Sequence, residues 1–178
     1  QDVRNILMKT YSTTEEIKGW GKVVLIKFKD GTHNVEVLPS WEQADHKFLI
    51  PNTENGGSWE TVDPRSEKAI LDECNKKFEN RCTFLVRILK RWAEYCSVNI
   101  KSFAIEQLCI SYLTNKGTIF QEISEEINSF FIYLENNIDA DNKSKVESAR
   151  KRSKKAIEFE KSGKLESASE EWRKIFGH

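Results

Sequence analysis

The chain has 178 residues, in which 28 Lys and Arg balance 28 Asp and Glu, and 38% of the residues are hydrophobic. This composition is typical of one compact globular domain or two small ones, and it excludes disordered and fibrous proteins. No stretch approaches the roughly 18 apolar residues that a membrane helix needs, and the first ten residues lack the order of a signal peptide. We therefore expect no membrane segment and a cytoplasmic location.

The charge balance also limits the kind of ligand site that the chain can carry. Because the formal net charge is zero, the chain lacks the long-range positive field of a general nucleic-acid binder. Binding to phosphate groups must then depend on local clusters of positive charge. The four cysteines lie in apolar helical contexts without a CxxC spacing, which predicts reduced core residues.

The N-terminal part of the chain predicts a helix followed by a β-hairpin. Apolar residues at intervals of three and four predict a short helix over residues 2–11. Residues 22–29 have the composition of a strand, Asp30-Gly31 is a turn signal, and residues 32–38 predict a second strand.

A two-residue turn would determine which side chains of this hairpin share a face. The cross-strand pairs expected on the apolar face are Val24 with Val37, Ile26 with Val35, and Phe28 with His33. Glu36 then lies on the other face, opposite Leu25. A carboxylate in the middle of a mostly apolar sheet is either part of a site or a solvated residue with Lys27 nearby.

The rest of the chain predicts a long loop and then helices. Residues 40–62 read as an irregular stretch, and ordered loops of that length are often functional. Asp63-Pro64 is a strong helix start, with Asp63 as the N-cap. The predicted helices span residues 64–79, 81–96, 102–114, 119–136, 143–161 and 164–176.

The helix over residues 81–96 carries positive charges on its polar side. Its apolar stripe comprises Cys82, Leu85, Val86, Leu89, Trp92, Ala93 and Cys96. Arg87, Lys90 and Arg91 remain outside that stripe and form a candidate cationic site. The alternative is an ordinary solvated face with an ion pair between Lys90 and Glu94.

Two further segments could bind anions. Ser102 begins a helix directly after Lys101, and free amide groups, a hydroxyl and a lysine together suit a polyphosphate. The alternative is an ordinary N-cap serine. Residues 143–155 hold seven Lys or Arg and one Glu, which makes them a candidate contact for nucleic acid or an acidic partner, or a solvated helix face.

A series of motifs along the chain resembles a known family. In order, the motifs are VEVLPSW, SWETVDPRSE, LVRILKRWAEY, KSFAIEQL and EEWRKIFG. The series resembles the bacterial cyclic-oligonucleotide synthases called CD-NTases, which are relatives of the animal cyclic GMP-AMP and oligoadenylate synthases. The resemblance implies an α+β, mostly helical fold. Residues 1–62, with the hairpin 22–38, would be the remainder of a polymerase-β-like nucleotidyltransferase core, and residues 63–178 a helical nucleotide-binding domain.

The resemblance also implies roles for single residues. Glu36 matches the third acidic residue of the family, which is catalytic and binds Mg²⁺, although the family more often has Asp there. Lys90 matches the lysine on the nucleoside triphosphate, and Ser102 matches the serine that binds the same phosphates. Phe103 takes the place of an aromatic residue that stacks on a base. The implied substrates are nucleoside triphosphates, ATP or GTP, with Mg²⁺ as the cofactor.

The sequence departs from the family pattern in its first part. The Gly-Ser turn and the catalytic DxD that precede the hairpin in the family are absent from these 178 residues. Two-metal phosphoryl transfer needs several carboxylates, and Glu36 alone cannot hold two Mg²⁺ ions. We therefore expect the chain to be the C-terminal part of a nucleotidyltransferase, inactive without the missing catalytic segment.

The complete enzyme would join nucleoside triphosphates into a cyclic or linear oligonucleotide second messenger, used in antiviral (antiphage) defence. Two alternatives remain open from the sequence. One is a noncatalytic binding module for nucleic acid or protein that retains the fold. The other is a nucleotidyltransferase that modifies RNA.

Overall fold

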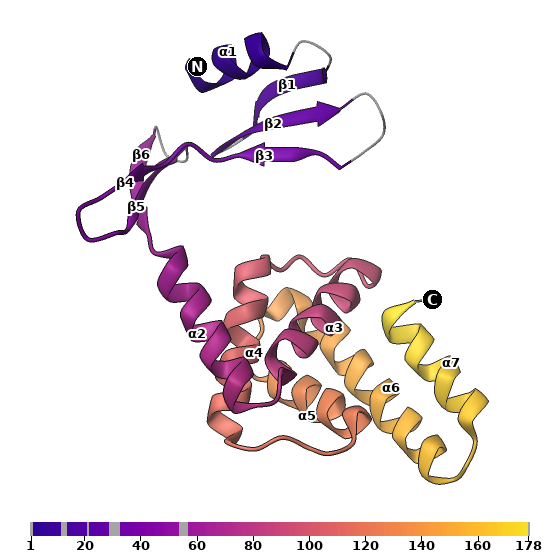
Figure 1. Cartoon of the computed structure of the whole chain (residues 1–178). Helices are drawn as coiled ribbons and strands as arrows, with labels where there is room; N and C mark the ends of the chain where they lie inside the picture. Colours follow the sequence, from indigo (N-terminus) through magenta and orange to yellow (C-terminus); the bar gives the residue numbers. More distant parts are fainter. Residues whose placement is uncertain (1, 12–13, 21, 29–32, 54–56, 178) are drawn as a thin grey trace. The chain divides into compact units, whose positions relative to one another are not determined.

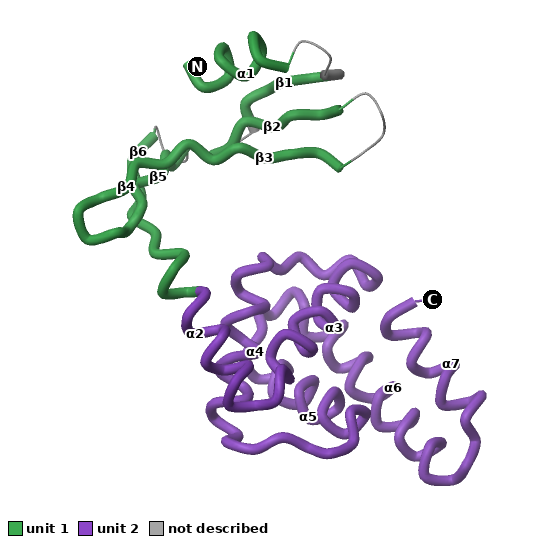
Figure 2. The backbone as a smooth tube through the Cα atoms, viewed as in Figure 1, with its two compact units in different colours: residues 1–67 green, residues 68–178 purple. Residues whose placement is uncertain are grey.

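The structure is a computed structural model that describes residues 2–11, 14–20, 22–28, 33–53 and 57–177. The chain forms two compact units, unit 1 over residues 1–67 and unit 2 over residues 68–178 (Figures 1 and 2). Unit 1 contains two small antiparallel sheets and unit 2 contains helices. The fold is thus α+β and mostly helical, as predicted. Among the described residues, no helix is both long enough and apolar enough to cross a membrane.

The first sheet of unit 1 contains the predicted hairpin and one strand that was not predicted. The elements are α1 (Asp2–Thr10), β1 (Thr14–Trp20), β2 (Val23–Phe28) and β3 (Val35–Val37), with the strands in the order β1-β2-β3. Val24 pairs with Val37, Leu25 with Glu36 and Ile26 with Val35, which confirms the predicted register.

Two details of the predicted hairpin are not covered by the confirmed register. The described pairs between β2 and β3 end at Ile26 with Val35, so the predicted pairing of Phe28 with His33 stays a prediction. The predicted Asp30-Gly31 turn lies outside the described residues.

One face of this sheet is covered by α1. Ile17, Val24 and Ile26 are buried on that face, and Val3 and Leu7 of α1 pack against them. Because side chains alternate along a strand, this packing directs the residues between them to the opposite face.

A second sheet replaces the irregular stretch that was predicted over residues 40–62. Its strands are β4 (Trp41–Glu42), β5 (Phe48–Asn52) and β6 (Ser58–Val62), in the order β4-β5-β6. The strands are short and interrupted by polar residues and Pro51, so hydrophobic alternation did not reveal them.

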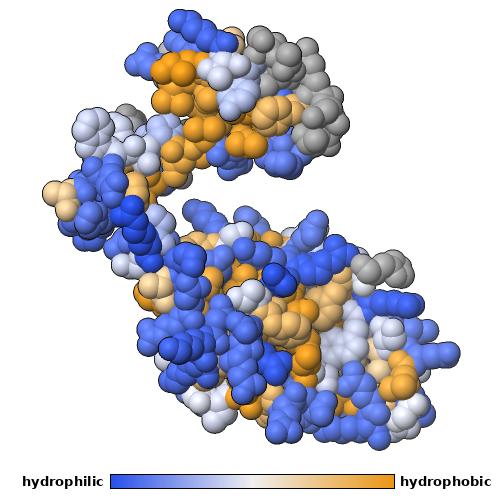
Figure 3. Space-filling model, in the orientation of Figure 1, coloured by the Kyte–Doolittle hydropathy of each residue, from blue (hydrophilic) through white to orange (hydrophobic). Residues whose placement is uncertain are grey.

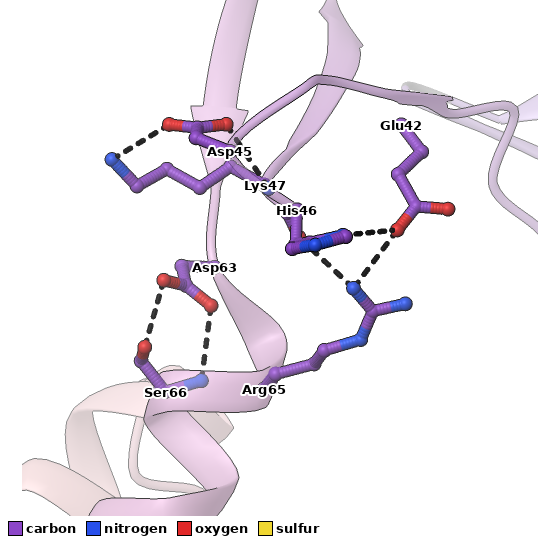
Figure 4. A network of polar contacts seen from close by, with 7 residues as sticks. All are labelled: Glu42, Asp45, His46, Lys47, Asp63, Arg65 and Ser66. Atoms are coloured by element: carbon purple, nitrogen blue, oxygen red, sulfur yellow. Dashed lines mark hydrogen bonds and ion pairs between the residues drawn. The ribbon is translucent and has the colours of Figure 1, made fainter.

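A polar network joins the turn between β4 and β5 to the start of α2 (Figure 4). Arg65 donates to the Glu42 carboxylate at 2.9 Å and to the His46 carbonyl at 3.2 Å. Asp63 caps α2 as predicted, because its carboxylate accepts hydrogen bonds from the Ser66 amide at 3.0 Å and the Ser66 hydroxyl at 2.7 Å. These two hydrogen bonds lower the pKa of Asp63.

The helices of unit 2 follow the predicted order, with small shifts at their ends. They are α2 (Pro64–Lys77), which begins in unit 1, α3 (Arg81–Tyr95), α4 (Ser102–Lys116), α5 (Ile123–Glu135), α6 (Lys143–Lys161) and α7 (Leu165–Phe176). A short 3₁₀ helix, η1 (Ala140–Asn142), precedes α6.

The core of unit 2 is built around the predicted stripe of α3. Cys82, Leu85, Val86, Leu89, Trp92 and Ala93 are buried, while Cys96 is half-buried. The Trp92 ring meets Phe131 edge to face, with 5.5 Å between ring centroids. All four cysteines are free thiols, as predicted, and burial raises the pKa of the Cys82 thiol to about 12.

A buried carboxylate fixes the start of α5, which begins four residues later than predicted. Glu126 is fully buried and accepts hydrogen bonds from the Tyr112 hydroxyl at 2.5 Å, Lys116 Nζ at 2.8 Å and the Phe120 amide at 2.7 Å. Because the Phe120 amide bonds to this carboxylate, residues 119–122 form a connection between α4 and α5 instead of helix.

We predict that Glu126→Ala lowers the free energy of unfolding by about 3 kcal/mol, because removal of the buried carboxylate leaves the Lys116 ammonium without its counter-charge and the Phe120 amide without its acceptor. Glu125→Ala is the matched control, since its ion pair with Lys161 is exposed and its loss costs less than about 1 kcal/mol. Urea denaturation followed by circular dichroism measures both. Equal losses would show that the buried network contributes no more than a surface pair.

The last two helices form the hairpin that the sequence predicts. Gly163, in the connection between α6 and α7, has a φ of 73°, a left-handed conformation that glycine adopts without strain. Glu171 of α7 is almost buried and forms ion pairs with Arg152 at 3.2 Å, Lys155 at 3.0 Å and Lys174 at 2.9 Å. Burial raises the pKa of Glu171, but the hydrogen bonds from Lys174 and Lys155 outweigh burial and set it at about 2.

We predict that this ion-pair cluster makes unit 2 sensitive to acid. The folded-state pKa of Glu171 lies below its ordinary value of 4.5, so its contribution to stability is present above pH 4.5 and is lost as the pH falls toward 2. Glu171→Gln should therefore reduce the fall in melting temperature between pH 5 and pH 2. Glu170→Gln should keep the wild-type pH dependence, and identical curves for the two variants would contradict the prediction.

Candidate functional site

Glu36 lies in the middle of β3, on the sheet face that α1 does not cover. Its side chain is exposed, and its cross-strand neighbour is Leu25 of β2. Among the described residues, no strand pairs with the outer edge of β3. Figure 3 shows apolar residues around this sheet on the visible face of unit 1, whereas the visible face of unit 2 is mainly hydrophilic. Glu36 is thus a carboxylate next to an open edge of backbone.

Lys27 does not neutralise Glu36. Lys27 Nζ pairs with Glu16 of β1 at 2.9 Å, and Lys18 pairs with the same carboxylate at 3.3 Å. These hydrogen bonds, the stronger from Lys27, lower the pKa of Glu16. Glu36 has no ion pair within the described part of the chain. The alternative interpretation was a solvated sheet face with Lys27 nearby; Glu36 is exposed, and Lys27 pairs with Glu16.

Lys90 extends from the exposed side of α3 toward α4. Its Nζ lies 3.2 Å from Glu106 Oε1, and its side chain is 42% exposed. The predicted ion pair between Lys90 and Glu94 is wrong, because Glu94 pairs with Arg91 at 3.5 Å. Lys90 pairs with Glu106, which is distant in the sequence, because burial of the α3 stripe packs α4 beside Lys90.

The start of α4 lies within reach of this ammonium group. Ser102 is four residues before Glu106 on the same helix, so the two side chains share a face one turn apart. Lys101 is the N-cap residue and forms no side-chain cap, and the Ser102 hydroxyl has no hydrogen-bond partner among the described residues. Ser102 is therefore not the ordinary N-cap that was the alternative interpretation. Phe103 follows it with an exposed fraction of 52%.

In unit 2, Lys90 thus contacts Glu106 of α4, one helical turn from Ser102 at the uncapped start of that helix, and Phe103 is the next residue. A helix start with free amide groups, a hydroxyl and an ammonium can bind the oxygens of a phosphate chain. Glu36 belongs to unit 1.

The other cations that the sequence singled out are largely occupied. Arg91 Nε donates to the Phe176 carbonyl at 2.7 Å, so Arg87, Lys90 and Arg91 do not act as one free patch. Five of the seven cations in residues 143–155 have partners: Lys145 with the Ser97 carbonyl, Arg150 with Glu135, Lys151 with Glu147, and Arg152 and Lys155 with Glu171. This pairing weakens the positive field of the segment and with it the prediction of a nucleic-acid contact there.

The described residues do not by themselves form a site for Mg²⁺. No group of three or more His, Cys, Asp or Glu in the described ranges is arranged to hold a metal ion. Glu36 offers one carboxylate, whereas Mg²⁺ takes an octahedral shell of oxygens. Further ligands from outside these residues are required for a metal at Glu36.

The sequence analysis missed an aromatic face on the second sheet. Trp41 pairs with Leu49, and Trp59 pairs with Pro51, and because Leu49 and Pro51 are two residues apart, all four lie on one face. Trp41 and Trp59 are 75% and 65% exposed. The period of two along β5 was the available signal, but the flanking glycines and Pro51 indicated a loop.

Three comparisons place this chain among known proteins. Residues 1–75 match the family model described as Second Messenger Oligonucleotide or Dinucleotide Synthetase domain. The chain is 27% identical to a probable cyclic nucleotide synthase of Bacillus cereus, over 73% of this chain and 45% of that relative. The chain therefore spans about half the length of this curated relative.

The fold is similar to that of a solved structure from Escherichia coli, CdnC in complex with HORMA-deltaN. The TM-score is 0.73 at 17% identity, and the match covers 99% of this chain and 69% of that chain. The synthetase-domain match, the relative and the fold agree with the motifs VEVLPSW and LVRILKRWAEY. They confirm the resemblance to the CD-NTase family that was drawn from the sequence.

Proposed function

We propose that this chain supplies the triphosphate-binding helices and one metal ligand of an enzyme that joins nucleoside triphosphates into a cyclic or linear oligonucleotide second messenger. The observation that carries the proposal is the position of the Lys90 ammonium beside Glu106 of α4, one turn from Ser102 at the uncapped start of that helix. The setting is cytoplasmic antiphage defence, as the family resemblance implies.

In this proposal the start of α4 binds the triphosphate of ATP or GTP. Lys90 would bind phosphate oxygens as a cation, and the Ser102 hydroxyl and the free amides of the first turn would donate hydrogen bonds. Glu106 holds Lys90 in place before the nucleotide arrives, which reduces the entropy lost on binding. Phe103 offers an exposed ring on which a base can stack.

Glu36 would act with carboxylates that lie outside these 178 residues. The open edge of β3 supports this part of the proposal, because a strand paired there would place its side chains beside Glu36. Mg²⁺ bound by such a set would activate the attacking hydroxyl and stabilise the leaving pyrophosphate. The 178 residues alone would be inactive.

The first test measures nucleotide binding to this chain. Lys90→Met should weaken ATP or GTP binding about tenfold, because a charge-assisted contact to phosphate is lost while the apolar stem is kept. Arg87→Met removes an equal charge one turn away on the same helix and should have little effect. Isothermal titration calorimetry measures both variants, and equal weakening would show that only the overall charge of α3 matters.

The second test measures catalysis by the full-length protein with labelled nucleoside triphosphates and Mg²⁺. Glu36→Gln should reduce product formation about a hundredfold or more, because metal stabilisation of the transition state is worth several kcal/mol. Glu60→Gln, in β6 of the second sheet, is the control and should retain activity. Full activity of Glu36→Gln would remove Glu36 from the site, and a product from RNA ends alone would favour an RNA-modifying enzyme.

A further inference from the structure

A cavity of about 190 Å³ lies between the C-terminal part of α3, the N-terminal half of α6 and the end of α7. Its lining consists of Trp92, Cys96, Ser144, Lys145, Ser148, Ala149, Arg152, Lys174 and Ile175. No carboxylate is part of this lining. The cavity lies on the buried side of α3, since Trp92 is two residues from Lys90 and so about 200° around the helix. It is therefore separate from the triphosphate site proposed above.

The apolar part of the lining consists of buried residues. Trp92, Ala149 and Ile175 are buried there. Trp92 Nε1 is fully buried and, among the described residues, has no hydrogen-bond acceptor. Buried N–H groups nearly always have a partner, because leaving one unpaired costs a large part of its lost hydration. This unpaired N–H belongs to a residue of the cavity lining.

The rim of the cavity is positive and is held in place by other contacts. Arg152 and Lys174 both pair with Glu171, at 3.2 and 2.9 Å, and Lys145 Nζ donates to the Ser97 carbonyl. Glu171 shares its single charge among these two residues and Lys155. Positive charge therefore remains in excess at the rim, and the cationic groups are already positioned for an anion.

We propose that this cavity binds a phosphate group, as inorganic phosphate or as the phosphate of a small phosphoester. The Arg and Lys side chains are hydrogen-bond donors only and the two serine hydroxyls can also donate, while phosphate is an acceptor with several oxygens in different directions. The volume is below the roughly 300–1,000 Å³ of sites for drug-sized ligands, which favours a small anion. This site does not depend on the proposed enzymatic function.

The primary test is calorimetric titration of the chain with inorganic phosphate at constant ionic strength. The double variant Lys145→Met, Lys174→Met should bind phosphate at least about tenfold more weakly, because two charge-assisted contacts are lost. Lys154→Met, Lys164→Met is the matched control, since both lysines lie outside the cavity lining and the change in net charge is the same. The control should bind as the wild type does.

Trp92 supplies a second readout that separates this site from the others. Trp92 is part of the cavity lining, so phosphate binding should change its fluorescence, and Trp92→Phe, which keeps a buried ring, should remove that change. Lys90→Met should leave both signals unchanged. Glycerol 3-phosphate and phosphate, titrated side by side, identify the source of the phosphate group by which of the two binds more tightly.

Several results would overturn the proposal. They are the absence of saturable phosphate binding to the wild type, equal affinities of the two double variants, loss of the signals in Lys90→Met, and binding of acetate as tight as that of phosphate. If the double variant unfolds, Ser148→Ala replaces it, and an affinity equal to that of the wild type would again contradict the site.

Discussion

The burial of one stripe of α3 determines how unit 2 presents its polar groups. Leu85, Leu89 and Trp92 are completely buried on one side of α3. Because the helix turns between them, the residues that lie between them in the sequence face the opposite, exposed side. Lys90 is therefore directed outward, beside α4, and Trp92 inward, toward α6 and α7. The two proposed phosphate sites therefore lie on opposite sides of the same helix. Neither would exist if the stripe were rotated by one residue.

In unit 1, the alternation of side chains along a strand determines which groups are buried and which are exposed. Ile26 and Val24 pack under α1, and their cross-strand partners Val35 and Val37 belong to the same layer. Glu36 lies between those partners and so reaches the uncovered face. A carboxylate at Glu36 is compatible with this hydrophobic strand because Val35 and Val37, on either side of it, supply the apolar contacts with the core.

Much of this arrangement could be predicted from local pattern. The register of Val24 with Val37 follows from alternation, and the Asp63 cap follows from residue type and the proline after it. The partner of Lys90 could not be predicted, because Glu106 is 16 residues away and only helix packing brings it near. The second sheet was missed since its strands, two to five residues long, give too few positions for a period to show.

The cations of residues 143–155 also have partners that only the packing of the helices brings near. Composition indicated a basic surface, yet Glu171, from the last helix, lies among Arg152 and Lys155 and accepts from both. A count of charges along the sequence cannot show this, because the carboxylate that neutralises them is on another element. Lys145, whose partner is the uncharged Ser97 carbonyl, keeps its positive charge beside the cavity.

The open edge of β3 has a consequence for how the protein avoids fibrils. A strand edge can template the addition of another copy, and long flat edges do so readily. This strand contains three residues and is followed two positions later by Pro39, which has no amide hydrogen to donate. The edge is thus short and offers another copy of the chain few backbone groups for pairing.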